Sequence, residues 1–359
     1  MANDKIFISA GDLSGDMHAA NLVKEIKKLS PSTVITASGG ENLKAVSDSF
    51  IEDIVNINAF GFFPLKPVFI LKETYKKIKA FFLSGRPDKV ILVDYYGFHS
   101  FVAKLAKRME IPVYYYVSPQ VWASRRSRIK VLAANVKKML CILPFEEKLY
   151  RDQGVDAFFV GNPLIDLVPE KTDFGPSSPP LIGLFPGSRK SVIKRHMPII
   201  LKTAAILREK LGAGFIIFSV NKNISAQLPD YIKHEPGGDF EKRKLIDIAL
   251  CPSGTVSLEN SLLGIPMAVM YKLSYFNYFF IKMIATVKYI TLANILAGKS
   301  IVPEFIQFDA EPEKIASCII EQLKPGNYAL KVNELLAFRK MLGKPGVSRR
   351  TAEIILSDK

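Results

Sequence analysis

Strand-like and helix-like segments alternate along this chain of 359 residues, and the alternation restarts once. Apolar strand-like runs occur in the first half at 5–10, 33–38, 89–94, 112–118, 137–143 and 157–161. After a segment rich in proline and serine, further runs follow at 181–187, 214–220, 248–254 and 266–272. Strands that alternate with helices predict a parallel, doubly wound sheet, so the restart predicts two α/β domains.

The proline- and serine-rich segment 169–180 is the predicted linker between a first domain, 1–168, and a second domain, 181–325. Two domains also suit the length, because single hydrophobic cores stop growing near about 250–300 residues. Residues 326–359 predict C-terminal helices interrupted at a Lys-Pro-Gly sequence. Ligands of such folds bind beyond the carboxyl ends of the strands, so we expect the two Rossmann-like domains to face a binding cleft.

Composition narrows the class of protein. Hydrophobic residues make up 48% of the chain and charged residues 23%, which is typical of a folded globular protein. Cys141, Cys251 and Cys318 lie far apart in apolar surroundings, so they predict neither a disulfide framework nor a metal site and fit a reducing compartment. We find no signal-peptide pattern and no apolar run of the ~20 residues that a spanning helix needs, and we expect a cytoplasmic protein.

The formal net charge of +15 implies an anionic partner, which is a nucleic acid, an anionic membrane surface or a phosphorylated substrate. Basic residues are interleaved with aromatic and aliphatic ones between residues 60 and 83. This pattern favours a lipid interface over a base-reading helix. Because no recognised nucleic-acid-binding motif is present, only the charge supports that class of partner, and we expect no nucleic acid.

The same stretch has helical periodicity from about Val68 onward. Its apolar face consists of Val68, Leu71, Tyr75, Ile78 and Phe82, and its basic face of Lys72, Lys76 and Lys79. We expect this helix to dock on an anionic membrane, because further aromatic side chains add more apolar surface than one packed face easily buries; these are Phe62, Phe63 and Phe69, together with Phe60. The alternative is an ordinary amphipathic helix that packs on the sheet.

Small residues follow the first apolar run, in "AGDLSGD" (10–16). Gly11 and Gly15 are too few for the three-glycine dinucleotide fingerprint, and the Gly-Lys-Ser/Thr sequence of a phosphate loop is absent. The stretch predicts an open turn that faces a ligand or, alternatively, a tight connection in which Asp16 or Ser14 caps the next helix.

Asp94 ends the most apolar strand of the first domain, "KVILVD". A carboxylate at this position faces the expected cleft, where it could take a proton from an incoming hydroxyl group as a general base. The alternative role of a lone aspartate at a strand end is to cap the following helix. His99 and Tyr95 lie nearby in the sequence.

Two turns of the second domain predict a nucleotide site. Gly187, Ser188 and Arg189 follow an apolar strand and precede a helix, so backbone N–H groups, the helix N-terminus and a guanidinium can bind phosphate. A second turn, Ser253-Gly254-Thr255, precedes a helix that carries Glu259, whose carboxylate could accept both ribose hydroxyls. The alternatives are a solvated basic turn and a capped helix with an exposed acid.

No metal-binding pattern accompanies these turns. The four histidines, His18, His99, His196 and His234, lack metal-ligand spacing, and no Asp-x-Asp motif is present to bridge a metal to a diphosphate. We therefore expect a mechanism without a metal or a cofactor.

Taken together, these motifs resemble those of the lipid-A-disaccharide synthase family of GT-B glycosyltransferases. "AGDLSGD", "SPQVWASRRSRIK" (118–130) and "LPFEEKLY" (143–150) are similar to family blocks of the first domain. In the second domain, "FPGSR", "SGTVSLE" and "LANILAGKSIVPEFIQ" (292–307) are similar to its donor-binding blocks. The resemblance spans nearly the whole chain.

The resemblance implies an inverting transfer of a diacylglucosamine unit from its UDP donor to the 6-hydroxyl of diacylglucosamine 1-phosphate. By position, Asp94 matches the family's proposed base, Arg189 its diphosphate-binding arginine, and Glu259 and Asn294 donor-site positions. Gly11 to Asp16 then form an acceptor-side turn, and the implied acceptor-side residues are Gly11, Asp12, Ser14, Gly15, Asp16 and, outside this turn, His99. The implied location is the cytoplasmic face of the inner membrane, and a homodimer stays open.

The chain departs from the family's motifs at five positions on or near the predicted sites. Asp12 replaces a glutamate, and Gly97 and His99 replace an aspartate and an asparagine. Asn162 replaces a histidine, and Val192 replaces a glutamate. These departures concern acceptor contacts more than the donor site. The alternative is therefore a divergent relative with an altered acceptor, or a weakly catalytic protein that binds UDP-sugars or lipids.

Overall fold

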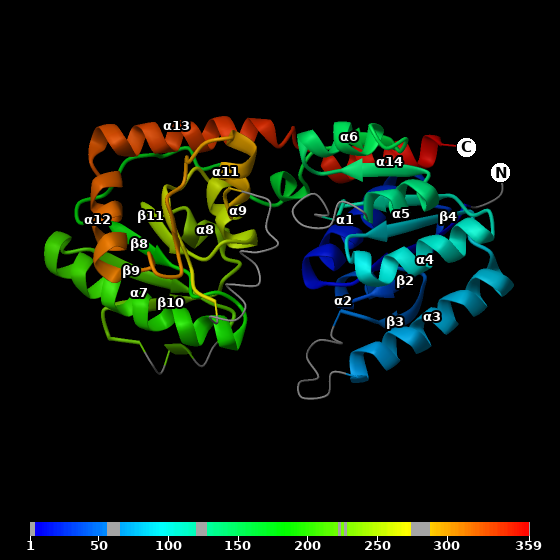
Figure 1. Cartoon of the computed structure of the whole chain (residues 1–359), viewed down its shortest axis with the longest axis horizontal. Helices are drawn as coiled ribbons and strands as arrows, with labels where there is room; N and C mark the ends of the chain where they lie inside the picture. The colour runs from blue at the N-terminus through cyan, green and yellow to red at the C-terminus, as the bar shows by residue number, and fades with distance from the viewer. Residues whose placement is uncertain are drawn as a thin grey trace. The chain divides into compact units, whose positions relative to one another are not determined.

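The structure is a computed structural model that describes residues 4–55, 65–119, 128–221, 224–225, 228–273 and 288–358. It consists of two compact units (Figure 1). The first unit comprises Met1–Asp166 and Leu342–Lys359, and the second comprises Leu167–Met341. Each contains one sheet whose described strands pair in parallel, so the predicted α/β class with Rossmann-like sheets is confirmed.

The first unit contains a seven-stranded sheet in the order β3-β2-β1-β4-β5-β6-β7. The strands are β1 (Lys5–Ala10), β2 (Val34–Gly39), β3 (Ser49–Asp53), β4 (Lys89–Val93), β5 (Val113–Tyr116), β6 (Lys138–Cys141) and β7 (Asp156–Phe159). The helices are α1 (Leu13–Leu29), α2 (Glu41–Lys44), α3 (Leu65–Gly85), α4 (Tyr96–Arg108), α5 (Arg128–Asn135), α6 (Pro144–Arg151) and α14 (Val347–Ser357), with a short 3₁₀ helix at Pro163–Asp166.

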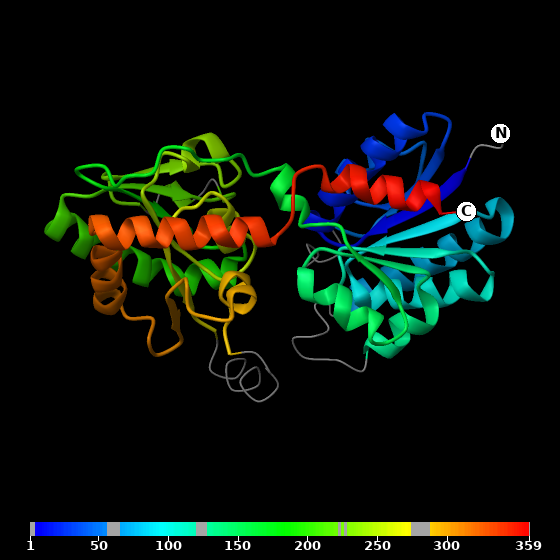
Figure 2. The same ribbon diagram turned by 90° about the horizontal axis from the view of Figure 1, so that it is seen from above.

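Side chains alternate between the two faces of this sheet, and each face has its own helical layer. Phe7 of β1 packs with α3, α4 and α5, whereas its neighbours Ile6 and Ile8 pack with α1 and α14. Helix α14 follows the whole second unit in the sequence but lies beside α1 (Figure 2). Residues 326–359 are therefore divided between the two units, with α13 (Pro325–Met341) in the second.

The second unit contains a six-stranded sheet in the order β10-β9-β8-β11-β12-β13. The strands are β8 (Leu181–Leu184), β9 (Gly214–Phe218), β10 (Ile232–Glu235), β11 (Ile248–Cys251), β12 (Met267–Tyr271) and β13 (Glu304–Ile306). The remaining helices are α7 (Lys190–Leu211), α8 (Phe240–Arg243), α9 (Thr255–Leu262), α11 (Leu292–Ala297) and α12 (Pro312–Gln322). Apolar side chains of α7 and α12 pack on one face of the sheet.

Helix α3 corrects the expectation of a lipid-facing apolar stripe. Ile78 and Phe82 are completely buried in the core, and Leu71 and Tyr75 pack against the same core. The face predicted to dock on a membrane thus packs on the sheet, except for Val68, which is 63% exposed. Phe69 is exposed to the same extent, whereas Phe62 and Phe63 lie outside the described residues.

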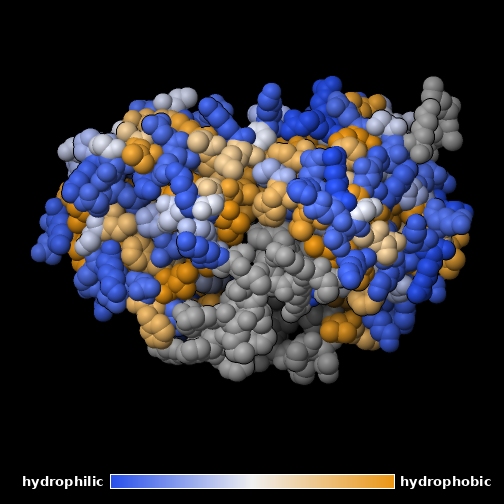
Figure 3. Space-filling view, turned by 45° about the horizontal axis from the view of Figure 1, so that its top comes forward, coloured by the Kyte–Doolittle hydropathy of each residue, from blue (hydrophilic) through white to orange (hydrophobic). Residues whose placement is uncertain are grey.

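On the face shown in Figure 3, hydrophobic and hydrophilic residues are interspersed. Among the helices in the described part of the chain, none combines the length and the hydropathy needed to cross a bilayer.

Each sheet has one point at which the strand order reverses. In the first unit this point lies between β1 and β4, and in the second between β8 and β11. Ligands of open α/β sheets bind outside the carboxyl ends of the strands at this point. A functional site is therefore expected in the loops after these four strands.

Candidate functional site

The backbone after β4 adopts an unusual conformation at Asp94 and Tyr95. Their φ angles are +48° and +50°, in the left-handed region that residues with a side chain seldom occupy. Such backbone strain persists only where surrounding contacts hold it, and it is concentrated at functional sites. Asp94 itself is partly buried next to this turn.

The carbonyl oxygen of Asp94 is held by two buried side chains. Nδ1 of His99 lies 2.8 Å from it, and the Tyr115 hydroxyl also donates a hydrogen bond to it. Burial lowers the pKa of His99 to about 4, so the ring is neutral near pH 7. Because a carbonyl oxygen can only accept, Nδ1 carries the proton, and Nε2 accepts from the Ser9 hydroxyl at 3.0 Å.

This arrangement corrects the predicted role of His99. The side chain is completely buried, so it supports the Asp94 backbone instead of contacting an acceptor. The support comes from three elements, since Ser9 lies on β1, His99 on α4 and Tyr115 on β5.

The carboxyl group of Asp94 has a pKa raised to about 6. Burial is the main cause, and the negative charge of Asp12 adds to it. A carboxylate with this pKa is ionised near pH 7 yet binds a proton more readily than an ordinary aspartate. It therefore has the protonation behaviour of a general base.

The turn after β1 is more enclosed than the sequence suggested. A Cβ atom at Gly11 would lie 2.1 Å from Cδ1 of Tyr95, so the glycine makes room for that ring. The N-cap of α1 is Asp12, whose Oδ1 accepts from the Gly15 N–H at 2.6 Å, and not Ser14 or Asp16.

Asp16 is 1% exposed and is fully occupied within the fold. Its Oδ1 accepts from the N–H groups of Gly40 (2.7 Å) and Leu43 (3.2 Å), and its Oδ2 accepts from Asn42. Asp16 thus holds the turn between β2 and α2 and is not available to an acceptor, and Gly15 is buried as well. Of the predicted acceptor-side turn, Asp12 and Ser14 keep accessible side chains.

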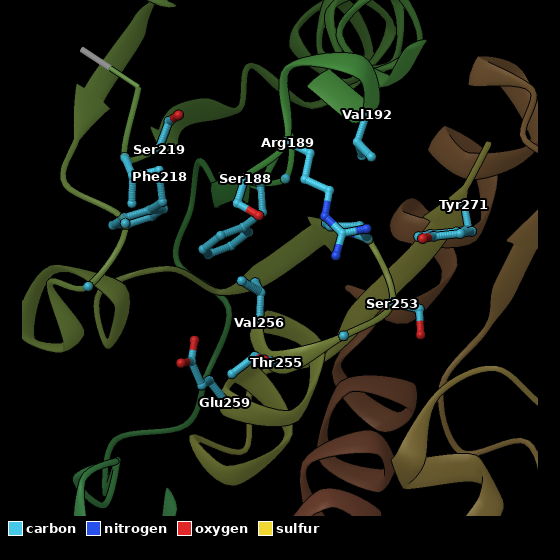
Figure 4. A pocket seen from close by; sticks show the side chains of 17 residues that line it. Ser188, Arg189, Val192, Phe218, Ser219, Ser253, Thr255, Val256, Glu259 and Tyr271 are labelled. Carbon is cyan, nitrogen blue, oxygen red and sulfur yellow. The ribbon is translucent and has the colours of Figure 1, made fainter. Parts of the chain in front are cut away.

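The second unit contains a pocket of about 510 Å³ beyond the ends of β8 and β11. Seven of the eight residues predicted to bind the donor line it: Gly187, Ser188, Arg189, Ser253, Gly254, Thr255 and Glu259. Figure 4 shows the Arg189 side chain extending into the pocket, with Tyr271 and Glu259 on different sides of it. Residues that the sequence analysis did not single out complete the wall, among them Phe185, Phe218, Ser219 and Tyr271.

Two glycines give the pocket its bare backbone. Gly187 and Gly254 have φ angles of +102° and +140°, which other residues rarely adopt. Each precedes the N-terminus of a helix, where unpaired N–H groups and the helix dipole attract anions. Since the Arg189 side chain is exposed beside these termini, the pocket has three sources of positive potential for a phosphate group.

His196 is a buried histidine behind this pocket, and its position in the sequence predicted no role for it. Burial lowers its pKa to about 4, so it is neutral. Its Nδ1 donates to the Pro186 carbonyl oxygen and its Nε2 accepts from the Lys272 N–H, both at 3.2 Å. His196 therefore joins the loop after β8 to the end of β12.

Asn294 does not line the pocket, which corrects its predicted donor contact. Its side chain is completely buried, and Oδ1 accepts from the N–H groups of Ile301 and Val302 at 2.8 and 2.9 Å. Nδ2 donates to the Val302 carbonyl oxygen and to Glu304. Asn294 thus fixes the loop that leads into β13.

The described residues contain no cluster of three or more histidine, cysteine, aspartate or glutamate side chains suited to a metal ion.

Comparison with known proteins gives a match along almost the whole chain. Residues 6–355 match the family model of lipid-A-disaccharide synthetase. A lipid-A-disaccharide synthase from Syntrophus aciditrophicus is 36% identical over 379 residues, covering 99% of this chain and 98% of the relative. Lipid-A-disaccharide synthase 1 from Legionella pneumophila strain Lens is 32% identical, covering 99% and 97%.

Solved structures share the fold at low sequence identity. UDP-GlcNAc 2-epimerase from Neisseria meningitidis aligns with a TM-score of 0.63 and 13% identity, over 98% of both chains. MurG from Acinetobacter baumannii aligns with a TM-score of 0.62 and 15% identity, over 99% of this chain and 100% of its own. These likenesses agree with the predicted GT-B fold.

Proposed function

Because the chain belongs to the lipid-A-disaccharide synthase family, we propose that it joins UDP-2,3-diacylglucosamine to 2,3-diacylglucosamine 1-phosphate. The products are the lipid A disaccharide 1-phosphate and UDP, and the enzyme is a glycosyltransferase of lipid A biosynthesis. The observation that carries this proposal is the match over residues 6–355, because it includes the carboxyl ends of β1, β4, β8 and β11.

Asp94 is the proposed general base. Its carboxylate takes the proton of the acceptor 6-hydroxyl while that oxygen forms a bond to the anomeric carbon of the donor. The bond from this carbon to the diphosphate oxygen breaks, and its electron pair leaves with UDP. Attack opposite the leaving group inverts the anomeric centre. The raised pKa and the supported backbone of Asp94 suit this role.

The pocket of the second unit is the proposed UDP site. Arg189 and the N-termini of α7 and α9 hold the diphosphate and stabilise the negative charge that grows on it as the glycosidic bond breaks. Glu259 accepts hydrogen bonds from the ribose hydroxyls. Arg189 and the two helix N-termini thus stabilise the charge of the leaving diphosphate, the role that a metal ion has in other transferases.

The acylated substrates imply work at a lipid surface, which we place on the inner face of the inner membrane. The net charge of +15 favours an anionic surface, and exposed Phe69 at the start of α3 supplies an apolar contact near it. The apolar stripe of α3 packs on the sheet, so among its residues only Val68 is exposed to such a surface.

The test is product mass from the purified protein with synthetic donor and acceptor, together with UDP release. We expect one UDP per disaccharide 1-phosphate formed. UDP binding without product would instead support the weakly catalytic UDP-sugar or lipid-binding relative. A product of different mass from a mixture of acceptors would indicate an altered acceptor.

A further inference from the structure

Arg243 is a completely buried cation in the second unit, at the C-terminal end of the short helix α8. Its guanidinium lies between two aromatic rings, 5.1 Å from the centre of Phe185 and 5.0 Å from that of Phe240. An ionised group without solvent is costly unless charged and polar partners compensate for it. Its partners therefore indicate what the buried charge does.

Both partners are consecutive residues of α9. Nη1 donates to Oε2 of Glu259 at 2.7 Å, and Nη2 donates to Oδ1 of Asn260 at 2.6 Å. Asn260 is completely buried, whereas the Glu259 side chain keeps 17% of its surface exposed. The guanidinium is thus fixed on its inner side by an amide and two rings, and on its outer side it holds a carboxylate.

That carboxylate lines the pocket and Arg243 does not. Within the described part of the chain, Oε2 of Glu259 is taken by Arg243 and Oε1 accepts no hydrogen bond. A glutamate on a helix ordinarily samples several rotamers, but a charge-assisted hydrogen bond to an immobile donor selects one. The arrangement leaves one carboxylate oxygen available at a fixed place in the pocket wall.

We infer that Arg243 is a positioning residue for ligand recognition, which holds Glu259 so that its free oxygen accepts from the ribose hydroxyls of a nucleoside diphosphate. The inference rests on the proposed function, because that proposal assigns the ribose contact to Glu259. Arg243 itself never touches the ligand. It sets selectivity for the ribose diol through the carboxylate.

The sequence conceals this residue. Arg243 lies in the run "EKRK" (241–244), which is typical of a solvated surface, and is 16 positions away from Glu259. The short helix α8 turns this single side chain inward, between Phe185 of the loop after β8 and Phe240.

The experiment compares the affinities of the full chain for UDP and for 2′-deoxy-UDP by titration calorimetry. The wild type is expected to bind UDP about tenfold or more tightly than 2′-deoxy-UDP, because a hydrogen bond to a charged group typically contributes that much to affinity. Glu259→Gln and Arg243→Met are both expected to reduce this preference to about twofold. Arg243→Lys keeps a cation but cannot hold Glu259 and Asn260 together, so an intermediate preference is expected.

Arg208→Met is the matched control, because Arg208 also packs over a ring, that of Tyr231, but does not line the pocket. It is expected to retain the wild-type preference. A purely structural Arg243 would weaken both ligands equally and leave their ratio unchanged, which would overturn the inference. If Arg243→Met does not fold, the ratio measured for Arg243→Lys decides in the same way.

The same measurements test the proposed ribose contact of Glu259 separately from the role of Arg243. If the wild type binds both nucleotides equally, or if Glu259→Gln keeps the preference, then Glu259 has no ribose contact for Arg243 to position. If only the Arg243 variants keep the wild-type preference, the ribose contact stands and the inference about Arg243 is wrong.

Discussion

The two sheets place different devices at the same topological position. After β4, the left-handed residues are Asp94 and Tyr95, and buried hydrogen bonds hold their strained backbone. After β8 and β11, the residues with positive φ are Gly187 and Gly254, which adopt that conformation easily. The first switch point thus fixes the backbone of the proposed general base, whereas the second exposes backbone N–H groups at the proposed nucleotide pocket. The shared fold explains where the sites lie, and the residues in the turns decide what each one does.

The strongest test of this division is the isosteric change Asp94→Asn. Loss of a general base typically lowers the rate about 10²–10⁴-fold, so we expect kcat to fall by that amount. UDP affinity is expected to stay within about twofold, because the change removes only proton acceptance in the first unit. Steady-state kinetics and UDP titration measure the two effects.

Activity within a few-fold of the wild type would show that Asp94 is structural and that the first switch point is not the reactive one. A parallel loss of UDP affinity would contradict the division of roles between the two units, because it would show that the Asp94 carboxylate also contributes to nucleotide binding.

Arg189→Ala probes the other switch point and is expected to act on binding and rate together. Removing one preorganised donor typically lowers kcat about 10²–10³-fold. The same guanidinium is proposed to hold the diphosphate in the ground state, so UDP affinity should fall as well. Arg189→Lys keeps the charge without the two-pronged geometry and should lie between the wild type and Arg189→Ala.

Lys190→Ala is the matched control, because Lys190 is an exposed neighbour that does not line the pocket. Chelation with EDTA is expected to change the rate little. A strong dependence on a divalent metal would contradict the assignment of Arg189 as the cationic group on the leaving diphosphate.

Sequence patterns predicted most of the fold because apolar strands in the middle of a parallel sheet are easy to recognise. All ten predicted strand-like runs overlap a strand of the structure. The three strands that were missed, β3, β10 and β13, lie at sheet edges and are short and mixed with charged residues. The position of α14 was also missed, because nothing in a local pattern shows that the last helix returns to the first sheet.

The candidate site residues also divide into those that local sequence patterns locate and those that depend on distant contacts. Residues in turns before helices, such as Arg189 and Thr255, line one pocket as their sequence positions suggested, because strand-turn-helix geometry is local. The roles of His99, Asp16 and Asn294 were not, because burial and hydrogen bonding over long sequence separations decide them. His99, for example, meets Ser9 from 90 positions away. A polar residue close to a turn in sequence can lie behind the turn instead of in front of it.

The pH dependence of the rate offers a finer test of the first switch point. Asp94 accepts a proton only when it is ionised, so kcat should fall as the pH drops below about 6, the raised pKa of this group. Its buried neighbours do not titrate there, because burial keeps His99 neutral above about pH 4 and raises the pKa of Tyr115 and Tyr150.

Asp12→Asn should move this acidic limb to lower pH, because it removes the negative charge that helps to raise the pKa of Asp94. We expect a shift of no more than about one unit. Asparagine is as good an N-cap as aspartate, so α1 should keep its stability. The measurement is kcat as a function of pH. An unchanged acidic limb in Asp12→Asn would show that the charge of Asp12 does not affect the pKa of Asp94.

The smallest expected effect concerns the membrane, where the first unit is again proposed to act. Phe69→Ser should lower binding to anionic vesicles several-fold, because it removes one exposed ring, 63% accessible, from the start of α3. Added salt should weaken the vesicle binding of both the wild type and Phe69→Ser, since lysines near an anionic surface contribute about 1 kcal/mol each and are screened.

Phe308→Ser, which changes a ring 60% exposed in the second unit, is the control and should bind like the wild type. Co-sedimentation with vesicles measures the binding, and circular dichroism checks that each variant stays folded. Phe82→Ser should instead unfold the protein, because Phe82 on the same helix is completely buried and packs edge to face on Phe7. Equal losses for Phe69→Ser and Phe308→Ser would mean that lipid contact is spread over both units, and the assignment of docking to α3 would then be wrong.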